Sequence, residues 1–249
     1  MLANLTKLNF TEPTQIQEKT LEILLEGKDL FAQAETGSGK TLAFSIPIIH
    51  SILQNKTQGI HSLIICPTRE LSQQITSVIE VLTKDLDIRF ACVIGGEDIE
   101  KQIQKINDSV NIIIGTPGRI CDLLNQGVIK LENLKSIAFD EVDRLFDMGF
   151  KKEIDAILQA TSESRQLILF SATNNNEVFN TAYRFGGNPV EVKLNEDQLV
   201  VDNIDHSMAM VNSAEKMSLL VGILDKNQDS YAMVFCNTQF QTHLVAEWL

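Results

Sequence analysis

A glycine-rich octapeptide between two apolar stretches constrains the fold of this chain more than any other segment. It spans residues 34–41, AETGSGKT, after the apolar run Leu30-Phe31-Ala32 and before another that begins at Leu42. Glycines allow a tight turn that points backbone N–H groups inward, and the N-terminus of a following helix adds partial positive charge. The sequence therefore predicts a strand, a phosphate-binding loop and a helix, in this order.

Two side chains of this loop have separate expected tasks. Lys40 would place a point charge on the outer phosphates, and the Thr41 hydroxyl would ligate Mg²⁺. The common pattern is G-x-x-x-x-G-K-[ST], and Ala34 stands where that pattern has its first glycine. A glycine-rich turn with a solvated lysine is the alternative, and the flanking strand and helix patterns argue against it. The residues expected to cradle the nucleotide phosphates are Thr36, Gly37, Ser38, Gly39, Lys40 and Thr41.

Length and composition indicate a protein with a substantial core. The 249 residues, 44% hydrophobic and 22% charged, suffice for one complete domain and part of another. No apolar run is long enough to span a bilayer and the N-terminus has no signal-peptide pattern, so we expect a cytoplasmic protein without membrane contact. The four cysteines and four histidines are dispersed, without metal-ligand spacing.

The net charge of −12 opposes general attraction to nucleic acid. Any nucleic-acid site must therefore be local, and the charge taken alone favours a small-molecule enzyme.

Short apolar strands alternate with helical segments along residues 30–194. This alternation predicts an α/β fold with a mainly parallel sheet covered by helices on both faces. Ligands of such sheets gather at the carboxyl ends of the strands. The expected strands lie at 62–66, 88–94, 110–114, 136–139, 166–170 and 190–194, besides the one before the phosphate loop.

The second chemical landmark is an acidic tetrapeptide, Asp140-Glu141-Val142-Asp143, after the apolar strand Ser136–Phe139. A carboxylate at the end of a strand beside a phosphate loop suits Mg²⁺, held directly or through water. Because adjacent side chains on extended backbone diverge, Asp140 is expected to face the metal and Glu141 to act on the water that attacks the γ-phosphate. A solvated acidic turn is the alternative.

A further strand leads into Ser171-Ala172-Thr173 at the same edge of the sheet. Small hydroxyl residues there can hydrogen-bond the acidic loop and respond to the nucleotide state, which would give Ser171 and Thr173 a part in catalysis. The alternative is a helix N-cap before a helix at Asn175–Arg184, because Ser and Thr favour that position. Capping and coupling could coexist.

Seven segments in a fixed order resemble those of the DEAD-box ATP-dependent RNA helicases of superfamily 2. The likeness covers nearly all of the first 200 residues, and the ordered set is far more specific than any one segment. Asn9, Gln15 and Val142 replace the family's usual glycine, proline and alanine. The segments are Phe10–Gln17, AETGSGKT at 34–41, PTREL at 67–71, Gly95-Gly96, TPGR at 116–119, DEVD at 140–143 and SAT at 171–173.

This resemblance implies a RecA-like P-loop fold, ATP and Mg²⁺ as ligands, and RNA as the partner. Gln17 would read the adenine edge and Phe10 would stack on the ring, while the lysine, threonine and carboxylates keep the roles given above. A single RNA strand would be held through its sugar-phosphate backbone, with little sequence specificity. A few amides, hydroxyls and two arginines suffice for such a track on an acidic protein. The residues implied are Pro67, Thr68, Arg69, Gly96, Thr116, Gly118 and Arg119.

The C-terminal part resembles only the opening of the family's second RecA-like domain. We expect a helix near Ala214–Leu224, a strand at Tyr231–Cys236 and a helix from Gln239 onward. The family's later arginine-rich segment, which completes the ATP site, is absent. The expected organisation is a RecA-like ATP-binding domain at 1–195, a linker at 196–212 and an incomplete second RecA-like domain at 213–249.

Three functions compete at this point. An RNA helicase would close two lobes over ATP and RNA and separate short duplexes locally. A one-lobed nucleotide and RNA binder without unwinding is the alternative, because the missing arginines contribute about 10³ to 10⁵ to turnover in comparable sites. The chain alone would then bind nucleotide and turn it over weakly. Another P-loop ATPase, such as a DNA helicase or a transport ATPase, conflicts with Phe10, Gln17 and the TPGR segment.

Overall fold

The computed structural model describes residues 2–7, 10, 12–55, 59–106, 109–173, 176–194, 205, 207–212, 214–227 and 231–249. Asn9, Asn175 and most of the acidic stretch that begins at Asn195 lie outside the described residues. The chain divides into two compact units, Met1–Glu196 and Asp197–Leu249.

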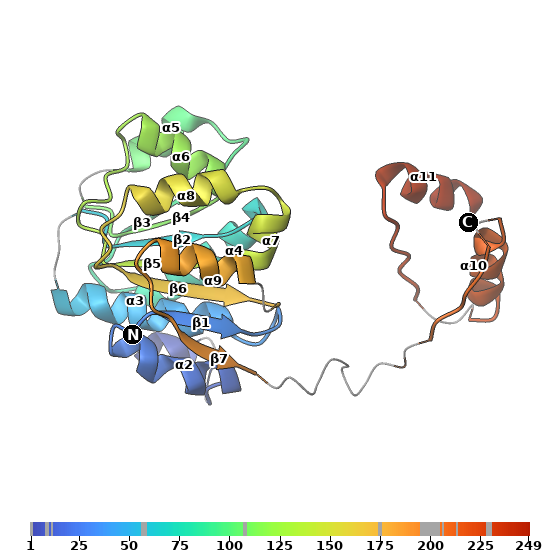
Figure 1. Ribbon diagram of the computed structural model, residues 1–249, viewed down its shortest axis with the longest axis horizontal. Coiled ribbons are helices and arrows are strands. Elements are labelled where there is room, and N and C mark those ends of the chain that lie inside the picture. Colours follow the sequence, from blue (N-terminus) through green and yellow to red (C-terminus); the bar gives the residue numbers. More distant parts are fainter. Residues whose placement is uncertain are drawn as a thin grey trace. The chain divides into compact units, whose positions relative to one another are not determined.

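The first unit contains a seven-stranded sheet in the order β3-β4-β2-β5-β6-β1-β7. Every neighbouring pair is parallel, so all the strands end at one edge of the sheet. The predicted α/β architecture is therefore confirmed (Figure 1). The strands are β1 (Leu30–Gln33), β2 (Ser62–Ile65), β3 (Phe90–Val93), β4 (Ile112–Gly115), β5 (Ser136–Phe139), β6 (Gln166–Ser171) and β7 (Val190–Lys193).

The helices of the first unit fall into two groups, one for each face of the sheet. The chain crosses from β1 through β2 to β3 in one direction, and returns through β4, β5 and β6 to β7. Because crossovers between parallel strands are right-handed, this reversal moves the connecting helices to the opposite face. One group is α1 (Leu2–Lys7), α2 (Gln15–Leu25), α3 (Lys40–Asn55) and α4 (Arg69–Thr83); the other is α5 (Ile99–Lys105), α6 (Pro117–Asn125), α7 (Val142–Asp147), α8 (Lys151–Gln159) and α9 (Asn176–Arg184).

Successive strand residues serve the two faces in turn. Ile113 of β4 packs in the core beneath α6 to α9, whereas Ile112 and Ile114 pack in the core beneath α2 to α4. All three side chains are fully buried. Strands covered on both faces read as continuous apolar runs, which is why the sequence signal was strong.

The second unit contains α10 (Lys216–Asp225) and α11 (Gln239–Trp248), close to the two expected helices. The strand expected at Tyr231–Cys236 is wrong, because these residues form neither a strand nor a helix. Tyr231, Met233 and Phe235 are largely exposed. A strand forms through ladder hydrogen bonds to a neighbour, and the described residues of this unit provide no other strand to pair with.

Among the described residues of both units, no helix combines the length and the apolar character that a membrane span requires.

A chain of buried polar side chains lies at the amino ends of β2 and β5. His61 is fully buried; its Nε2 lies 3.3 Å from Ser51 Oγ and its Nδ1 lies 2.9 Å from Ser62 Oγ. Ser62 Oγ is 2.8 Å from Ser136 Oγ on the neighbouring strand. Burial, with a contribution from the Lys135 charge, lowers the pKa of His61 from 6.5 to about 4. The imidazole is therefore neutral in the folded protein at neutral pH.

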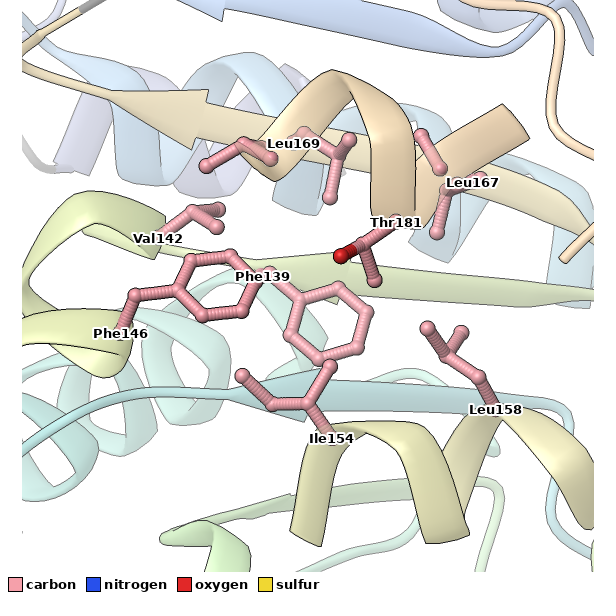
Figure 2. Close-up of a pocket in the computed structure, with 10 residues that line it drawn as sticks. Phe139, Val142, Phe146, Ile154, Leu158, Leu167, Leu169 and Thr181 are labelled. Carbon is pink, nitrogen blue, oxygen red and sulfur yellow. The ribbon is translucent and has the colours of Figure 1, made fainter. Parts of the chain in front are cut away.

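A small apolar cavity of about 10 Å³ lies among β5, β6, α7, α8 and α9. Figure 2 shows Phe139, Phe146 and Val142 along one side of it and Leu167, Leu169 and Thr181 along another. Val142, 2% exposed, fixes the first turn of α7 against this cluster. The valine of the acidic tetrapeptide is thus a core residue, one position away from a candidate catalytic carboxylate.

The buried His61 should make the protein less stable in mild acid. The unfolded chain takes up the proton near pH 6.5, whereas the folded chain resists it down to about pH 4, so stability is lost as pH falls through this window. The free energy of unfolding, measured in urea, should fall between pH 7 and pH 5 in the unmutated protein. In His61→Gln this fall should be smaller by about 2 kcal/mol. His50→Gln, at an exposed position of α3, is the control and should leave the loss unchanged. Equal pH dependence in both variants would contradict the assignment.

Truncation of Val142 should destabilise the first unit while leaving the carboxylates in place. Val142→Ala removes two buried carbon groups and enlarges an existing cavity, so we expect a loss of about 1 to 2.5 kcal/mol in the free energy of unfolding. Val190→Ala, at a position 38% exposed, should lose less than about 0.5 kcal/mol. Chemical denaturation of both variants gives the comparison, and equal losses would show that Val142 packing is not special.

Candidate functional site

The sequence motifs meet at the carboxyl edge of the sheet in two neighbouring groups. The phosphate loop, the SAT segment and the acidic tetrapeptide follow β1, β6 and β5, which are adjacent strands. The PTREL, TPGR and glycine-pair segments follow β2, β4 and β3, which are also adjacent. Since β5 pairs with β2, the two groups share a border. The order of strands thus separates the residues expected for nucleotide from those expected for RNA.

The phosphate loop has the backbone that its glycines predict. Gly37 and Gly39 have φ values of 87° and 95°, in the left-handed region that favours glycine. Ser38 Oγ donates to Glu35 O at 2.8 Å, and α3 begins at Lys40. The loop therefore leads straight into a helix N-terminus, which favours bound anions.

Lys40, the first residue of α3, and Asp140, the residue after β5, form a buried pair. Lys40 Nζ lies 3.7 Å from Asp140 Oδ1 and donates to Ala34 O at 3.3 Å; the two residues are 6% and 2% exposed. Burial raises the pKa of Asp140 to about 6, Lys40 opposes the rise, and the Glu141 charge adds to it. The lysine thus provides the countercharge that a buried carboxylate requires.

Glu141 occupies a strained backbone conformation beside this pair. Its φ and ψ are 52° and 54°, and Asp85 is the other described non-glycine residue with positive φ. The Glu141 N–H donates to Asp140 Oδ1 at 3.0 Å. Its carboxylate accepts from Thr36 Oγ1 and from Arg144 Nη1, both at 3.3 Å. The glutamate is therefore held against the phosphate loop rather than turned to solvent.

The SAT segment contacts the acidic tetrapeptide through Asp143. Asp143 Oδ2 accepts from both the N–H and the hydroxyl of Thr173, each at 3.0 Å. Ser171 is the last residue of β6 and its Oγ accepts from Thr173 N at 3.3 Å. The predicted hydrogen bond to the acidic loop is present, while the residues just before α9, where a cap would lie, are outside the described part of the chain.

Gln17 connects the N-terminal segment to the phosphate loop. Its Nε2 donates to Gly39 O and its Oε1 accepts from Thr14 N, both at 3.0 Å. A Cβ added to Gly39 would lie 2.6 Å from Gln17 Nε2, so glycine alone permits this approach. Phe10 is 46% exposed and its ring is therefore accessible to a ligand.

The second group of residues surrounds the loop that follows β3. Gly96 has a φ of 79°, and a Cβ there would lie 2.1 Å from Arg69 Nη1, so the guanidinium lies directly over the glycine. Arg119 Nη2 donates to Glu97 O at 3.0 Å, and its Nη1 is buried without a hydrogen-bond partner among the described residues. Thr68 caps α4 by accepting from Leu71 N at 3.2 Å.

The remaining residues of the expected track lie on the same edge. Thr116 is the N-cap of α6 and Pro67 lies just after β2, both buried. A Cβ at Gly118 would meet no atom within 4 Å, so that glycine faces open space. Backbone groups, hydroxyls and two guanidinium groups therefore gather at this edge, the combination that phosphate contacts use.

Three functional neighbours were not among the sequence-predicted site residues. Asp143 bridges to Thr173, Arg144 pairs with Glu141, and Thr14 shares the amide of Gln17. Asp143 is the fourth residue of the acidic tetrapeptide and Arg144 follows it directly. Their position at this motif is the sequence feature that could have identified them. No local pattern marks Thr14 beyond its helix-capping position.

The donor set of the first group fits a nucleotide with Mg²⁺. No cluster of three or more His, Cys, Asp or Glu side chains that could hold a metal occurs among the described residues. Mg²⁺ is usually bound by one or two protein ligands together with substrate phosphates and waters. Thr41 and Asp140 are suited to that mode, and the buried Lys40 ammonium suits the phosphates.

Comparisons with known proteins agree with this arrangement. A sequence model of the DEAD/DEAH box helicase family matches residues 14–181. The ATP-dependent RNA helicase CshA of Listeria monocytogenes is 37% identical over 96% of this chain and 46% of its own length. CshA of Geobacillus kaustophilus is 36% identical over 98% of this chain and 52% of its own length.

Solved structures give the same result at the level of the fold. The crystal structure of a DEAD box protein from the hyperthermophile Methanococcus jannaschii has a TM-score of 0.74 and 37% identity, over 99% of this chain and 66% of that one. The chain spans about half the length of the curated relatives it matches. Because the family model covers more than half of the sequence and the fold agrees, the chain belongs to the DEAD/DEAH box helicase family.

Proposed function

We propose that the protein is an ATP-dependent RNA helicase that couples ATP hydrolysis to RNA binding and local duplex unwinding. The observation that carries the proposal is the meeting of two residue groups at one edge of the sheet, one suited to a nucleotide and one to a sugar-phosphate backbone. The helicase names of the relatives support the same function. Tested alone, the 249 residues are expected to bind nucleotide and to turn it over weakly, because an arginine-rich segment of the kind that the family's second lobe supplies does not occur among them.

In the proposed mechanism Lys40 holds the outer phosphates. Thr41 and Asp140 would hold a Mg²⁺ ion, which would supply positive charge beside these phosphates. Glu141 orients and deprotonates the attacking water. The Thr36 and Arg144 contacts keep the glutamate beside the phosphate loop. The other cradle residues, from Gly37 to Gly39, hold the phosphates through backbone N–H groups.

Coupling between nucleotide and RNA is proposed to pass through the acidic tetrapeptide. Asp143 joins it to Ser171-Ala172-Thr173, and β5 joins it to β2, which carries Pro67, Thr68 and Arg69. A change in the position of Asp140 or Glu141 therefore has a direct route to the neighbouring strand ends. RNA is held through its backbone by these residues and by Gly96, Thr116, Gly118 and Arg119.

A one-lobed nucleotide and RNA binder without unwinding is the second candidate function. It is favoured by the second unit, whose described residues contain two helices and no strand. Comparison of this chain with any longer form of the protein, in ATP turnover with and without RNA and in unwinding of a short RNA duplex, separates the two candidates.

Two substitutions distinguish the phosphate-binding role proposed for Lys40 from the water-activating role proposed for Glu141. Lys40→Ala removes the positive charge that faces the outer phosphates and leaves the buried Asp140 carboxylate without its countercharge, so ADP affinity should fall about 100-fold or more. Glu141→Gln keeps the shape and loses the base, so ADP affinity should stay within about threefold while ATP turnover disappears. Calorimetric titration and ADP release, with and without RNA, give both readouts.

Lys130→Ala, at an exposed position, is the control and should change neither quantity. Turnover by Glu141→Gln at the unmutated rate would remove the glutamate from the mechanism. Strong RNA-stimulated turnover by the unmutated chain would contradict the weak activity proposed for it.

Adenine selectivity is proposed to depend on Gln17. An amide that donates and accepts at once matches the adenine edge, whereas guanine presents the opposite pattern. The unmutated chain should bind ADP about tenfold or more tighter than GDP, and Gln17→Ala should bring this ratio close to one. Gln15→Ala, at an exposed position of the same helix, should keep the ratio. Equal affinity of the unmutated chain for ADP and GDP would contradict the proposed recognition of adenine by Gln17.

A further inference from the structure

Gln102 lies buried at the point where β3 leaves the sheet. It belongs to α5 and is 2% exposed. Its Oε1 accepts from Ile94 N at 3.2 Å, and its Nε2 donates to Ile94 O at 3.0 Å. Nε2 also donates to Glu97 Oε2 at 3.3 Å. One amide therefore holds both backbone groups of Ile94 and the side chain of Glu97.

This amide takes the place of a neighbouring strand. β3 is at the edge of the sheet and ends at Val93, so Ile94 is the first residue beyond the ladder. Ile94 is itself 2% exposed, and buried backbone groups without partners are costly. A side-chain amide supplies one acceptor and two donors in a plane, which matches the two backbone groups. The direction in which the chain leaves β3 is thereby fixed.

The loop that starts at Ile94 supports both arginines of the proposed RNA track. The Arg69 guanidinium lies over Gly96, so close that a Cβ there would be 2.1 Å from Nη1. Glu97 O accepts from Arg119 Nη2 at 3.0 Å. A second guanidinium nitrogen of Arg119, Nη1, is buried without a hydrogen-bond partner among the described residues. A shift of this loop would move the surface against which both guanidinium groups rest.

We propose that Gln102 is a positioning residue for RNA binding, which sets the 94–97 loop so that Arg69 and Arg119 present their guanidinium groups to RNA phosphates. This inference rests on the proposed RNA-binding function. The amide also holds the Glu97 carboxylate, the negative charge nearest to the track on this loop. Gln102 itself makes no contact with RNA in this arrangement, because it is buried behind the loop.

The test replaces the amide without changing its length. Gln102→Met removes all three hydrogen bonds and keeps a helix-forming side chain of similar size. Gln104→Met makes the same change at an exposed position of the same helix. Titration of a labelled single-stranded RNA oligonucleotide should show about tenfold weaker binding for Gln102→Met, the effect of a loop that is competent a tenth of the time. Gln104→Met should bind as the unmutated chain does.

Two further readouts separate a positioning role from a general structural one. ADP affinity of Gln102→Met should stay within about twofold, because the nucleotide group follows other strands. Amide hydrogen exchange should accelerate at residues 94–97 and remain unchanged in β1 and β5. Parallel losses of RNA affinity, ADP affinity and melting temperature would overturn the proposal in favour of a folding role.

A second variant tests the Glu97 contact within the same network. Gln102→Glu loses the donor and faces Glu97 with a like charge, so RNA binding should weaken at least as much as in Gln102→Met. Adding Glu97→Gln to it restores one donor and acceptor pair, and part of the RNA affinity should return. Absence of any recovery would count against the proposed loop network.

Arg119→Ala separates failure of this inference from failure of the proposed function. Tight RNA binding by Gln102→Met together with weak binding by Arg119→Ala would overturn the role of Gln102 and leave the RNA site standing. Unchanged RNA binding by Arg119→Ala and by Arg69→Ala would overturn the RNA site, and the inference with it.

Discussion

The parallel pairing of all seven strands is the constraint on which the site depends. It brings segments from residues 34 to 173 to one edge, although they are far apart in sequence. The handedness of the crossovers then decides which helices cover which face. Neither face can be left uncovered, because strand residues such as Ile112 and Ile113 point their apolar side chains in opposite directions. The chemistry of the edge is thus secured by packing on both sides of the sheet.

At this edge, residues that are far apart in sequence meet because the strands that precede them are close together in the sheet. The Lys40 and Asp140 pair joins strands β1 and β5 across β6, and the Asp143 and Thr173 contact joins the ends of β5 and β6. Asp140 N in turn donates to Ile65 O of β2 at 2.9 Å. The end of β5 therefore contacts the first group of site residues and the strand that leads into the second group. Its apolar side is anchored equally firmly, through Phe139 and Val142 around the small cavity (Figure 2).

The elements that the sequence predicted best are those with purely local causes. β5 has the bounds expected for it, Ser136–Phe139, and α2 ends before Gly27, whose φ of 77° is the left-handed value expected of a helix-ending glycine. The strand order, and with it the bond from Thr173 to Asp143, depends on tertiary pairing that no local pattern encodes. The left-handed backbone of Glu141 is equally invisible, since glutamate has no preference for it. The expected strand at Tyr231–Cys236 failed because apolar periodicity describes a side-chain pattern, whereas a strand also requires a partner.

The left-handed conformation of Glu141 has a consequence for how stability and activity are balanced at this site. A non-glycine residue there costs about 1 to 3 kcal/mol, which the surrounding fold must supply. Residues that tolerate this conformation, such as glycine or asparagine, would relieve the strain but remove the carboxylate. In the proposed mechanism, which requires this carboxylate, the most stable sequence and the most active sequence therefore differ at this position. That mechanism explains a left-handed glutamate as a residue kept for the position of its carboxylate, at the expense of local stability.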